Sequence, residues 1–269
     1  MTDEPAGSGI WILEKPGGEG SAPRRLSPAR LFALLQTAAA EHAEALGVGG
    51  DSLREQRLAW VLLQWSLEMS SWPAAGESVR IETWPSGYTD RIVRRDFFVR
   101  SADGTRIGRA TSHWAMLDLD RRRPVRMPGS VRAIPTPVRD GALDATLEKF
   151  PAPDPPASVR TFRVSGEHLD ANGHVNNVRF VEWILASLPA EAAARPLDAI
   201  GLAFRAEGRD GETLTVACGP DPAPPPGRLA FRHRIEADGR ELLLARSVVA
   251  RDASPVFSLA DILSGGPAS

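Results

Sequence analysis

The chain reads GESVRI at residues 76–81 and GETLTV at residues 211–216, so one strand-like pattern recurs after 135 positions. The same offset relates Ala102-Asp103-Gly104 to Ala237-Asp238-Gly239, and it pairs Ala110 and Ser112 with Ala245 and Ser247. Each Asp-Gly pair lies between two strand-like runs and predicts a two-residue hairpin turn, because that turn needs positive φ at both central residues. Three matches at a single offset indicate that the chain contains a duplicated unit.

Each half of the chain is expected to open with a helix. In the first half Ser27 is a favoured N-cap, Pro28 suits the first helical position, and apolar residues recur near a 3.6-residue period until Gly47. In the second half Asn176 can cap a helix that ends before Pro189. His42 falls on the apolar face of the first helix and is interpreted as a core histidine.

The remaining periodic segments predict strands. They lie near residues 58–71, 78–84, 90–101 and 105–118 in the first half, and near 198–207, 211–218, 228–237 and 240–251 in the second. A short strand is expected before each helix, near residues 9–14 and 158–165. The order strand, helix and four antiparallel strands, read twice, predicts an α+β fold class: a tandem (double) hotdog, each unit a long helix wrapped by a curved antiparallel sheet.

The predicted organisation has three parts. Residues 1–127 form the N-terminal hotdog, which shapes an acyl pocket, and residues 158–269 form the C-terminal, catalytic hotdog. Between them residues 128–157 contain seven prolines, which predicts a semi-rigid spacer outside the core.

The composition excludes several classes of protein. A formal net charge of −2 over 269 residues gives no reason to expect a nucleic acid or membrane partner. The acidic N-terminus lacks an apolar signal core, and no stretch approaches the roughly 18 apolar residues of a membrane span, so a cytoplasmic protein is predicted. Cys218 is the only cysteine and the five histidines lack ligand spacing, so neither a metal nor any other cofactor is expected.

The densest polar cluster spans residues 170–177, directly before the second helix. Asp170, Asn172 and His174 alternate, so an extended segment would present all three on one side. It leads into a helix N-terminus, whose N–H groups favour a developing oxyanion. Taken singly, these residues are typical of turns and caps. At the aligned place in the first half stand Ser21, Pro23 and Arg25, so only the second half keeps the polar set.

This cluster carries a resemblance to a known family. Asp170-x-Asn172-x-His174-Val175-Asn176-Asn177, followed by Phe180-x-x-Trp183-Ile184-Leu185, resembles the signature of plant and bacterial acyl-acyl-carrier-protein (acyl-ACP) thioesterases. Phe204-Arg205-Ala206-Glu207 is similar to their second signature, and Arg94-Arg95-Asp96-Phe97 is among the further motifs of the first half that match in order and spacing. The resemblance implies hydrolysis of fatty acyl-ACP to free fatty acid and holo-ACP, with Asp170, Asn172, His174 and Glu207 as the catalytic set.

One departure from the family pattern limits the chemistry. Many members have a cysteine after the glutamate, where this chain has Gly208, so a cysteine nucleophile at that place is impossible. Cys218 is instead expected to be a small buried hydrophobe. The expected reaction is attack by water, with Glu207 or Asp170 as the base and Asn172 holding the carbonyl or the water. His174 would act as the general acid–base group or fix the geometry of the carboxylate. Covalent catalysis by an aspartate stays open.

The substrate contacts are expected in both halves. Amides near His174 to Asn176 would polarise the thioester carbonyl, and Trp65 would line the acyl tunnel. An arginine cluster, which includes Arg122 and Arg126, would steer the acidic carrier protein. We define this cluster as Arg121, Arg122, Arg123, Arg126 and Arg132. The cluster can equally be interpreted as the solvated end of a strand without a binding role.

Three alternatives stay open at this stage. A hotdog thioesterase acting on coenzyme A esters would use the same residues and differ only in the carrier-docking surface. A hotdog dehydratase is disfavoured because its histidine pattern is not evident near His174, and a non-catalytic acyl-binding hotdog is disfavoured because the polar set is retained. The sequence leaves acyl chain length and oligomeric state open, with a homodimer as one candidate.

Overall fold

The structure of the protein is a computed structural model that describes residues 10–16, 25–74, 76–144, 147 and 149–251. These residues divide into two compact units. The first unit contains residues 10–16, 34–67, 78–144 and 147, and the second contains residues 25–33, 68–74, 76–77 and 149–251. No helix among the described residues is both long enough and apolar enough to cross a membrane.

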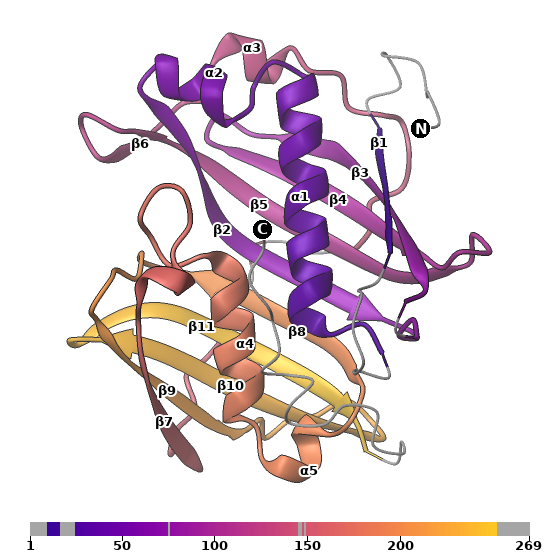
Figure 1. The fold of residues 1–269 in the computed structure, drawn as a ribbon, viewed down its shortest axis with the longest axis vertical. Coiled ribbons are helices and arrows are strands. Elements are labelled where there is room, and N and C mark those ends of the chain that lie inside the picture. Colours follow the sequence, from indigo (N-terminus) through magenta and orange to yellow (C-terminus); the bar gives the residue numbers. More distant parts are fainter. Residues whose placement is uncertain (1–9, 17–24, 75, 145–146, 148, 252–269) are drawn as a thin grey trace. The chain divides into compact units, whose positions relative to one another are not determined.

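The sheet of the first unit has the strand order β1-β3-β4-β5-β2. These strands are β1 (Trp11–Pro16), β3 (Ser78–Tyr88), β4 (Ile92–Arg100), β5 (Arg106–Asp118) and β2 (Leu58–Met69), and β6 (Arg123–Val125) adds to β5. The long helix α1 (Pro28–Ala45) crosses these strands (Figure 1) and buries one side, which includes Leu34, Leu35 and Ala38. Two short helices, α2 (Gly50–Glu55) and α3 (Gly129–Arg132), complete the unit.

The second unit repeats this order as β7-β9-β10-β11-β8. Its strands are β7 (Ser158–Arg163), β9 (Thr213–Pro220), β10 (Arg228–Ala237), β11 (Arg240–Ala250) and β8 (Leu197–Phe204). Helix α4 (Asn177–Ser187) packs on β7 and β9 (Figure 1), between the short helical turns η1 (Gly166–His168) and α5 (Ala190–Ala193). The predicted sequence of elements is therefore confirmed in both units.

The helix ends follow the predicted local chemistry. The Ser27 hydroxyl accepts a hydrogen bond from the Arg30 amide at 3.2 Å, and Asn176 Oδ1 accepts one from the Val178 amide at 3.1 Å. Gly47 follows α1 with a φ of +70°, the left-handed conformation that ends many helices. Both caps and the glycine stop are confirmed.

The two Asp-Gly turns differ. Asp238 and Gly239 both have positive φ between paired Ala237 and Arg240, so the predicted two-residue turn is confirmed in the second unit. In the first unit the prediction is wrong, because five residues separate paired Arg100 and Arg106. The Asp103 carboxylate there accepts the Thr105 amide at 3.0 Å and the Ser101 hydroxyl at 2.5 Å, which stabilises the wider loop.

The proline-rich segment is not a spacer outside the core. Val131 and Ala142 are buried in apolar clusters of the first unit. Phe150 packs on Ala203 and Leu244 in the second unit. Pro restricts backbone conformation but does not prevent neighbouring apolar side chains from burying their surface, so the prediction of an uninvolved segment is wrong.

Candidate active site

The predicted polar cluster is a tight turn. The Asp170 amide donates to the His174 carbonyl at 2.8 Å, the Gly173 amide donates to the Asp170 carbonyl at 3.0 Å, and Gly173 has a φ of +76°. One carboxylate oxygen of Asp170 accepts the amides of Asn172 at 2.8 Å and His174 at 3.2 Å. The expectation of an extended segment with three aligned side chains is therefore wrong, because Asp170 folds the chain back on itself.

A second segment brings a carboxylate to this turn. His174 forms an antiparallel bridge with Arg209, and the Val175 amide donates to the Gly208 carbonyl at 2.9 Å. As a result the Nε2 atom of His174 lies 3.1 Å from Oε2 of Glu207. Both side chains keep about a third of their surface exposed, 33% and 36%, so water and a substrate can reach the pair.

Gly208 makes this approach possible. A Cβ atom at Gly208 would lie 2.8 Å from Cγ2 of Val175, closer than side-chain carbons normally approach. The sequence drew attention to this position only through the missing cysteine, and its packing role was missed. A second missed residue is Arg240, which donates to the Glu207 carbonyl at 3.4 Å and pairs with the Glu212 carboxylate. Because Glu212 also accepts the Arg209 amide at 2.9 Å, the loop that holds Glu207 is fixed from both sides.

Most amides around the start of α4 already have acceptors. The His174 amide donates to Asp170, the Val175 amide to Gly208 and the Asn176 amide to the His168 carbonyl. The expectation that the amides of residues 174–176 polarise the thioester carbonyl is therefore wrong. In the described part of the chain, the Asn177 amide is the one between residues 172 and 179 without an acceptor.

The other predicted substrate contacts lie elsewhere. The side chain of Asn176 caps α4. Trp65 is buried in the first unit, with its ring centroid 6.1 Å from that of Phe97, and it does not line the cavity of that unit. Arg122 and Arg126 are exposed, in the turn before β6 and just after β6. The structure thus brings together Asp170, Asn172, His174 and Glu207 in the second unit.

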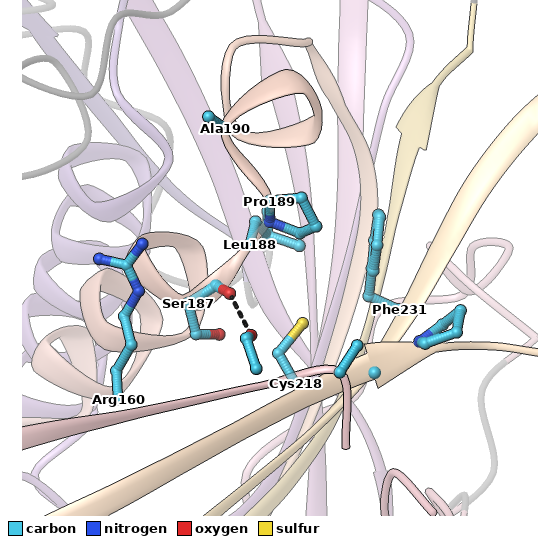
Figure 2. A pocket seen from close by; sticks show the side chains of 11 residues that line it. Arg160, Ser187, Leu188, Pro189, Ala190, Cys218 and Phe231 are labelled. Carbon is cyan, nitrogen blue, oxygen red and sulfur yellow. Dashed lines mark hydrogen bonds between the residues drawn. The ribbon is translucent and has the colours of Figure 1, made fainter. Parts of the chain in front are cut away.

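A pocket of about 260 Å³ in the second unit lies at the other end of α4 (Figure 2). Its lining includes Ser187, Leu188, Phe231 and Cys218. Since α4 has 11 residues, this pocket lies about 16 Å along the helix from the His174–Glu207 pair. Burial raises the pKa of the Cys218 thiol to about 11, so Cys218 is protonated near neutral pH and is a poor nucleophile. The described residues contain no cluster of three or more His, Cys, Asp or Glu side chains that could hold a metal ion.

The comparisons with known proteins agree with the fold. The N-terminal domain of acyl-ACP thioesterases matches residues 18–134, and the C-terminal domain matches residues 153–249. The chain is 32% identical over 192 residues to the chloroplastic oleoyl-acyl carrier protein thioesterase 1 of Arabidopsis thaliana, an alignment that covers 65% of this chain and 53% of that protein. The chain therefore spans about half the length of this curated relative.

Two solved structures are similar over nearly their whole length. An acyl-ACP thioesterase from Bacteroides thetaiotaomicron superimposes with a TM-score of 0.78 at 25% identity, covering 89% of this chain and 97% of that one. The 12:0-ACP thioesterase from Umbellularia californica, at 22% identity, gives a TM-score of 0.76 and covers 88% and 96%. The predicted α+β double hotdog is confirmed by these likenesses. Because both domains match in order, the chain belongs to the acyl-ACP thioesterase family.

Proposed function

We propose that the protein hydrolyses fatty acyl-ACP thioesters to free fatty acid and holo-ACP, and so ends or diverts fatty acid synthesis. The observation that carries the proposal is the 3.1 Å contact between His174 Nε2 and Glu207 Oε2, beside the N-terminus of α4. A carboxylate and an imidazole in contact can share the proton transfers that hydrolysis requires.

The reaction begins with a water molecule hydrogen-bonded to Glu207. As the water oxygen bonds to the thioester carbonyl carbon, the Glu207 carboxylate takes one proton from it. The resulting tetrahedral intermediate carries a negative charge on the former carbonyl oxygen. Its collapse breaks the carbon–sulfur bond, and the His174–Glu207 pair returns the proton to the leaving sulfur, which becomes the free thiol of the carrier.

The developing oxyanion needs donors that the protein does not already use. We assign this role to the Asn177 amide, supported by the positive end of the α4 dipole. Asn172 is exposed at the tip of the turn, where its side-chain amide can orient the carbonyl or the water.

Asp170 has a different role in this proposal. One of its oxygens accepts two backbone amides, which holds the turn that presents Asn172 and His174. We therefore assign the base to Glu207 and treat Asp170 as a positioning residue. The oxygen that accepts these two amides is not available to a water molecule or to the thioester carbon, which disfavours a covalent aspartyl intermediate.

The carrier protein is the proposed partner. The arginine cluster presents five exposed positive charges at the end of the first unit's sheet and in α3. Acyl carrier proteins are acidic, so this charge favours their approach. A coenzyme A thioester would react by the same chemistry, and the carrier must be identified by experiment.

The test is an assay of the purified chain on ACP and coenzyme A thioesters of several acyl lengths, with release of the free thiol as the readout. We expect a higher kcat/KM for the ACP substrates, and a loss of about 10²-fold or more in kcat for Glu207→Gln. Glu241→Gln is the matched control, because Glu241 is a half-exposed carboxylate whose ion pair among the described residues is with Arg205. Hydrolysis of no thioester, or equal rates for both Glu variants, would contradict the proposal.

A further inference from the structure

The pocket of about 260 Å³ at the C-terminal end of α4 has no role in the proposed hydrolysis. It lies within the second unit, about 16 Å along α4 from the proposed catalytic pair. Most of its wall is apolar: Leu188 and Pro189 come from the end of the helix, and Pro220 and Phe231 come from β9 and β10 (Figure 2). The second unit therefore contains an apolar site apart from its catalytic groups.

The first unit has a cavity at the corresponding place, about 220 Å³ between α1 and the sheet. In the second unit Pro220 of β9 pairs with Phe231 of β10, and both line the pocket. In the first unit Pro85 of β3 pairs with Arg95 of β4, and both line the cavity. Pro85 and Pro220 are 135 positions apart, which is the offset of the internal repeat. The duplication thus places one cavity in each unit, and Phe231 stands in the second where Arg95 stands in the first.

This exchange leaves the inner wall of the second unit's pocket uncharged. The Ser158 hydroxyl donates to the Ser187 carbonyl at 3.1 Å (Figure 2), and the Ser187 hydroxyl donates to the Ile184 carbonyl at 2.7 Å. Burial raises the pKa of the Cys218 thiol to about 11, so this group is neutral near pH 7. With both hydroxyl protons already donated, the inner wall suits a hydrocarbon chain, whose entry would remove apolar surface from water.

Arg160 is the one charged residue in the described lining. It is exposed and belongs to β7, the outermost strand of this unit's sheet, so it lies where the pocket meets solvent. Within the described chain no carboxylate forms an ion pair with Arg160. A guanidinium at the mouth of an apolar pocket fits an amphipathic anion, whose chain fills the pocket while its head group stays in water.

We propose that this pocket binds a free straight-chain fatty acid of about eight carbons, with its chain against Leu188, Pro189 and Phe231 and its carboxylate on Arg160. The volume sets the length: at about 30 Å³ for each water-sized group, 260 Å³ holds roughly nine heavy atoms. Octanoate has nearly this size.

The head group selects between free and carrier-bound acyl chains. A thioester has no carboxylate to pair with Arg160, whereas the free acid does. The free acid is also the product of the proposed hydrolysis, so the pocket would be a second site for product, apart from the catalytic pair. Binding itself does not require hydrolysis.

The test measures binding of octanoate, octan-1-ol and butanoate to the full chain by isothermal titration calorimetry. We expect octanoate to bind at least tenfold more tightly than butanoate, because four more methylene groups leave water. Octanoate should bind several-fold more tightly than octan-1-ol, since an exposed ion pair adds modestly to affinity.

Variants locate the site. Arg160→Met should remove the preference for octanoate over octan-1-ol, and Arg160→Lys should keep part of it. Ala190→Trp should weaken octanoate binding at least tenfold, because Ala190 is an exposed lining residue and an indole there would fill the mouth of the pocket. Arg163→Met in the same strand and Arg251→Met remove exposed arginines outside the lining and are the matched controls.

The proposal is overturned if octanoate does not bind. It is also overturned if Arg160→Met and Ala190→Trp bind octanoate as the unaltered protein does, since a heat of binding common to all variants arises at another site. Because Arg160 is exposed, its replacement keeps the test decisive should Ala190→Trp fail to fold. Glu207→Gln should bind octanoate like the unaltered protein, so a failure of the proposed function is distinguished from a failure of this site.

Discussion

One carboxylate oxygen of Asp170 accepts two amides of its own turn, whereas the carboxylate of Glu207 contacts His174. The two carboxylates are therefore expected to have different roles. An asparagine at position 170 keeps an oxygen acceptor in the same place, but alanine does not. We therefore expect Asp170→Asn to retain more activity than Asp170→Ala, and to lose less than Glu207→Gln. Steady-state kcat for the three variants tests this order. If Asp170→Asn is as inactive as Glu207→Gln, then the charge of Asp170 takes part in the chemistry.

The surroundings of His233 lead to a second prediction at the scale of single residues. It is fully buried, with its ring nitrogens 3.2 Å from the Ser187 hydroxyl and 2.7 Å from the Ser247 hydroxyl. Burial lowers its pKa from 6.5 to about 3. As the pH falls below 6.5 the unfolded chain therefore gains a proton that the folded chain does not, and the folded state loses stability.

Between pH 7.5 and pH 5 this one residue should lower the free energy of unfolding by about 2 kcal/mol. The loss accumulates over the 1.5 pH units between the unfolded pKa of 6.5 and pH 5, at about 1.36 kcal/mol per unit. His233→Gln removes the titrating group. The variant should be less stable than the unaltered protein at pH 7.5, but its stability should fall less on acidification. Urea unfolding followed by tryptophan fluorescence at the two pH values measures both effects. Parallel losses in the two proteins would show that His233 does not titrate as described.

At the scale of the elements, the site depends on how two loops meet. The turn before α4 and the loop after β8 are joined by the Val175 amide and the Gly208 carbonyl, at 2.9 Å. Gly208→Ala would place a Cβ atom 2.8 Å from Val175 Cγ2, so the loops must move apart and Glu207 must shift from His174. A displacement near 1 Å at a catalytic pair can cost up to about 10²-fold in rate. We expect a fall of tenfold or more in kcat.

The double variant Gly208→Ala/Val175→Ala should recover most of that loss, because the clashing methyl group is gone. Gly166→Ala is the matched control: a Cβ atom there meets nothing within 4 Å, and the residue has no positive φ. If the double variant is as slow as Gly208→Ala alone, then the effect arises from backbone strain and not from this contact.

Sequence periodicity predicts the elements that are long enough to show a repeating apolar pattern. α1, α4 and several of the main strands, such as β3 and β10, bury one face, and a buried face leaves a repeating apolar pattern. α2 and α3 have six and four residues, less than two helical turns, which is too few for a helical period to emerge, and they form because the surrounding core accepts Leu53 and Val131. β6 has only three residues. The wide loop at residues 101–105 was missed because a side-chain contact of Asp103 outweighs the Asp-Gly preference.

The candidate site was predicted by residue type but not by geometry. Motif residues mark Asp170, Asn172, His174 and Glu207, yet their arrangement depends on contacts between segments more than 30 residues apart. Sequence periodicity says nothing of such contacts. The burial of Arg95, of which 8% is exposed, was also missed, because an arginine in a strand normally faces solvent.

At the scale of the whole chain, the duplicated unit has diverged in its chemistry. Both units keep the same strand order, but in the sequence Ser21, Pro23 and Arg25 stand before the first helix where Asp170, Asn172 and His174 stand before the second. Of these aligned residues in the first half of the sequence, Ser21 and Pro23 lie outside the described residues. Arg25 donates to the Trp72 carbonyl at 2.7 Å, a structural contact. In the proposed function one set of groups performs the chemistry, and the first half of the chain is available for other interactions.

The arginine cluster is one such feature. Its charge is partly balanced: Arg121 lies 3.6 Å from Asp118, and Arg126 lies 3.9 Å from Asp90. Both arginines are exposed, so these pairs are weak and leave positive potential at the surface. An acidic carrier would be steered by that potential, mainly through its association rate, over a Debye length of about 10 Å at 0.1 M salt.

Charge reversal of the cluster tests this steering. Arg122→Glu/Arg126→Glu should raise KM for acyl-ACP several-fold, while kcat and the hydrolysis of short coenzyme A or pantetheine thioesters stay nearly unchanged. The defect should shrink as salt is raised from 0.05 to about 0.5 M, because screening removes the attraction in the unaltered protein as well. Arg251→Glu, at an exposed arginine of the second unit, controls for the change in net charge. Equal losses on carrier-bound and short substrates would mean that Arg122 and Arg126 support the fold or the catalytic groups. A defect in KM that does not change with salt would mean that they bind the carrier by direct contact and not by long-range attraction.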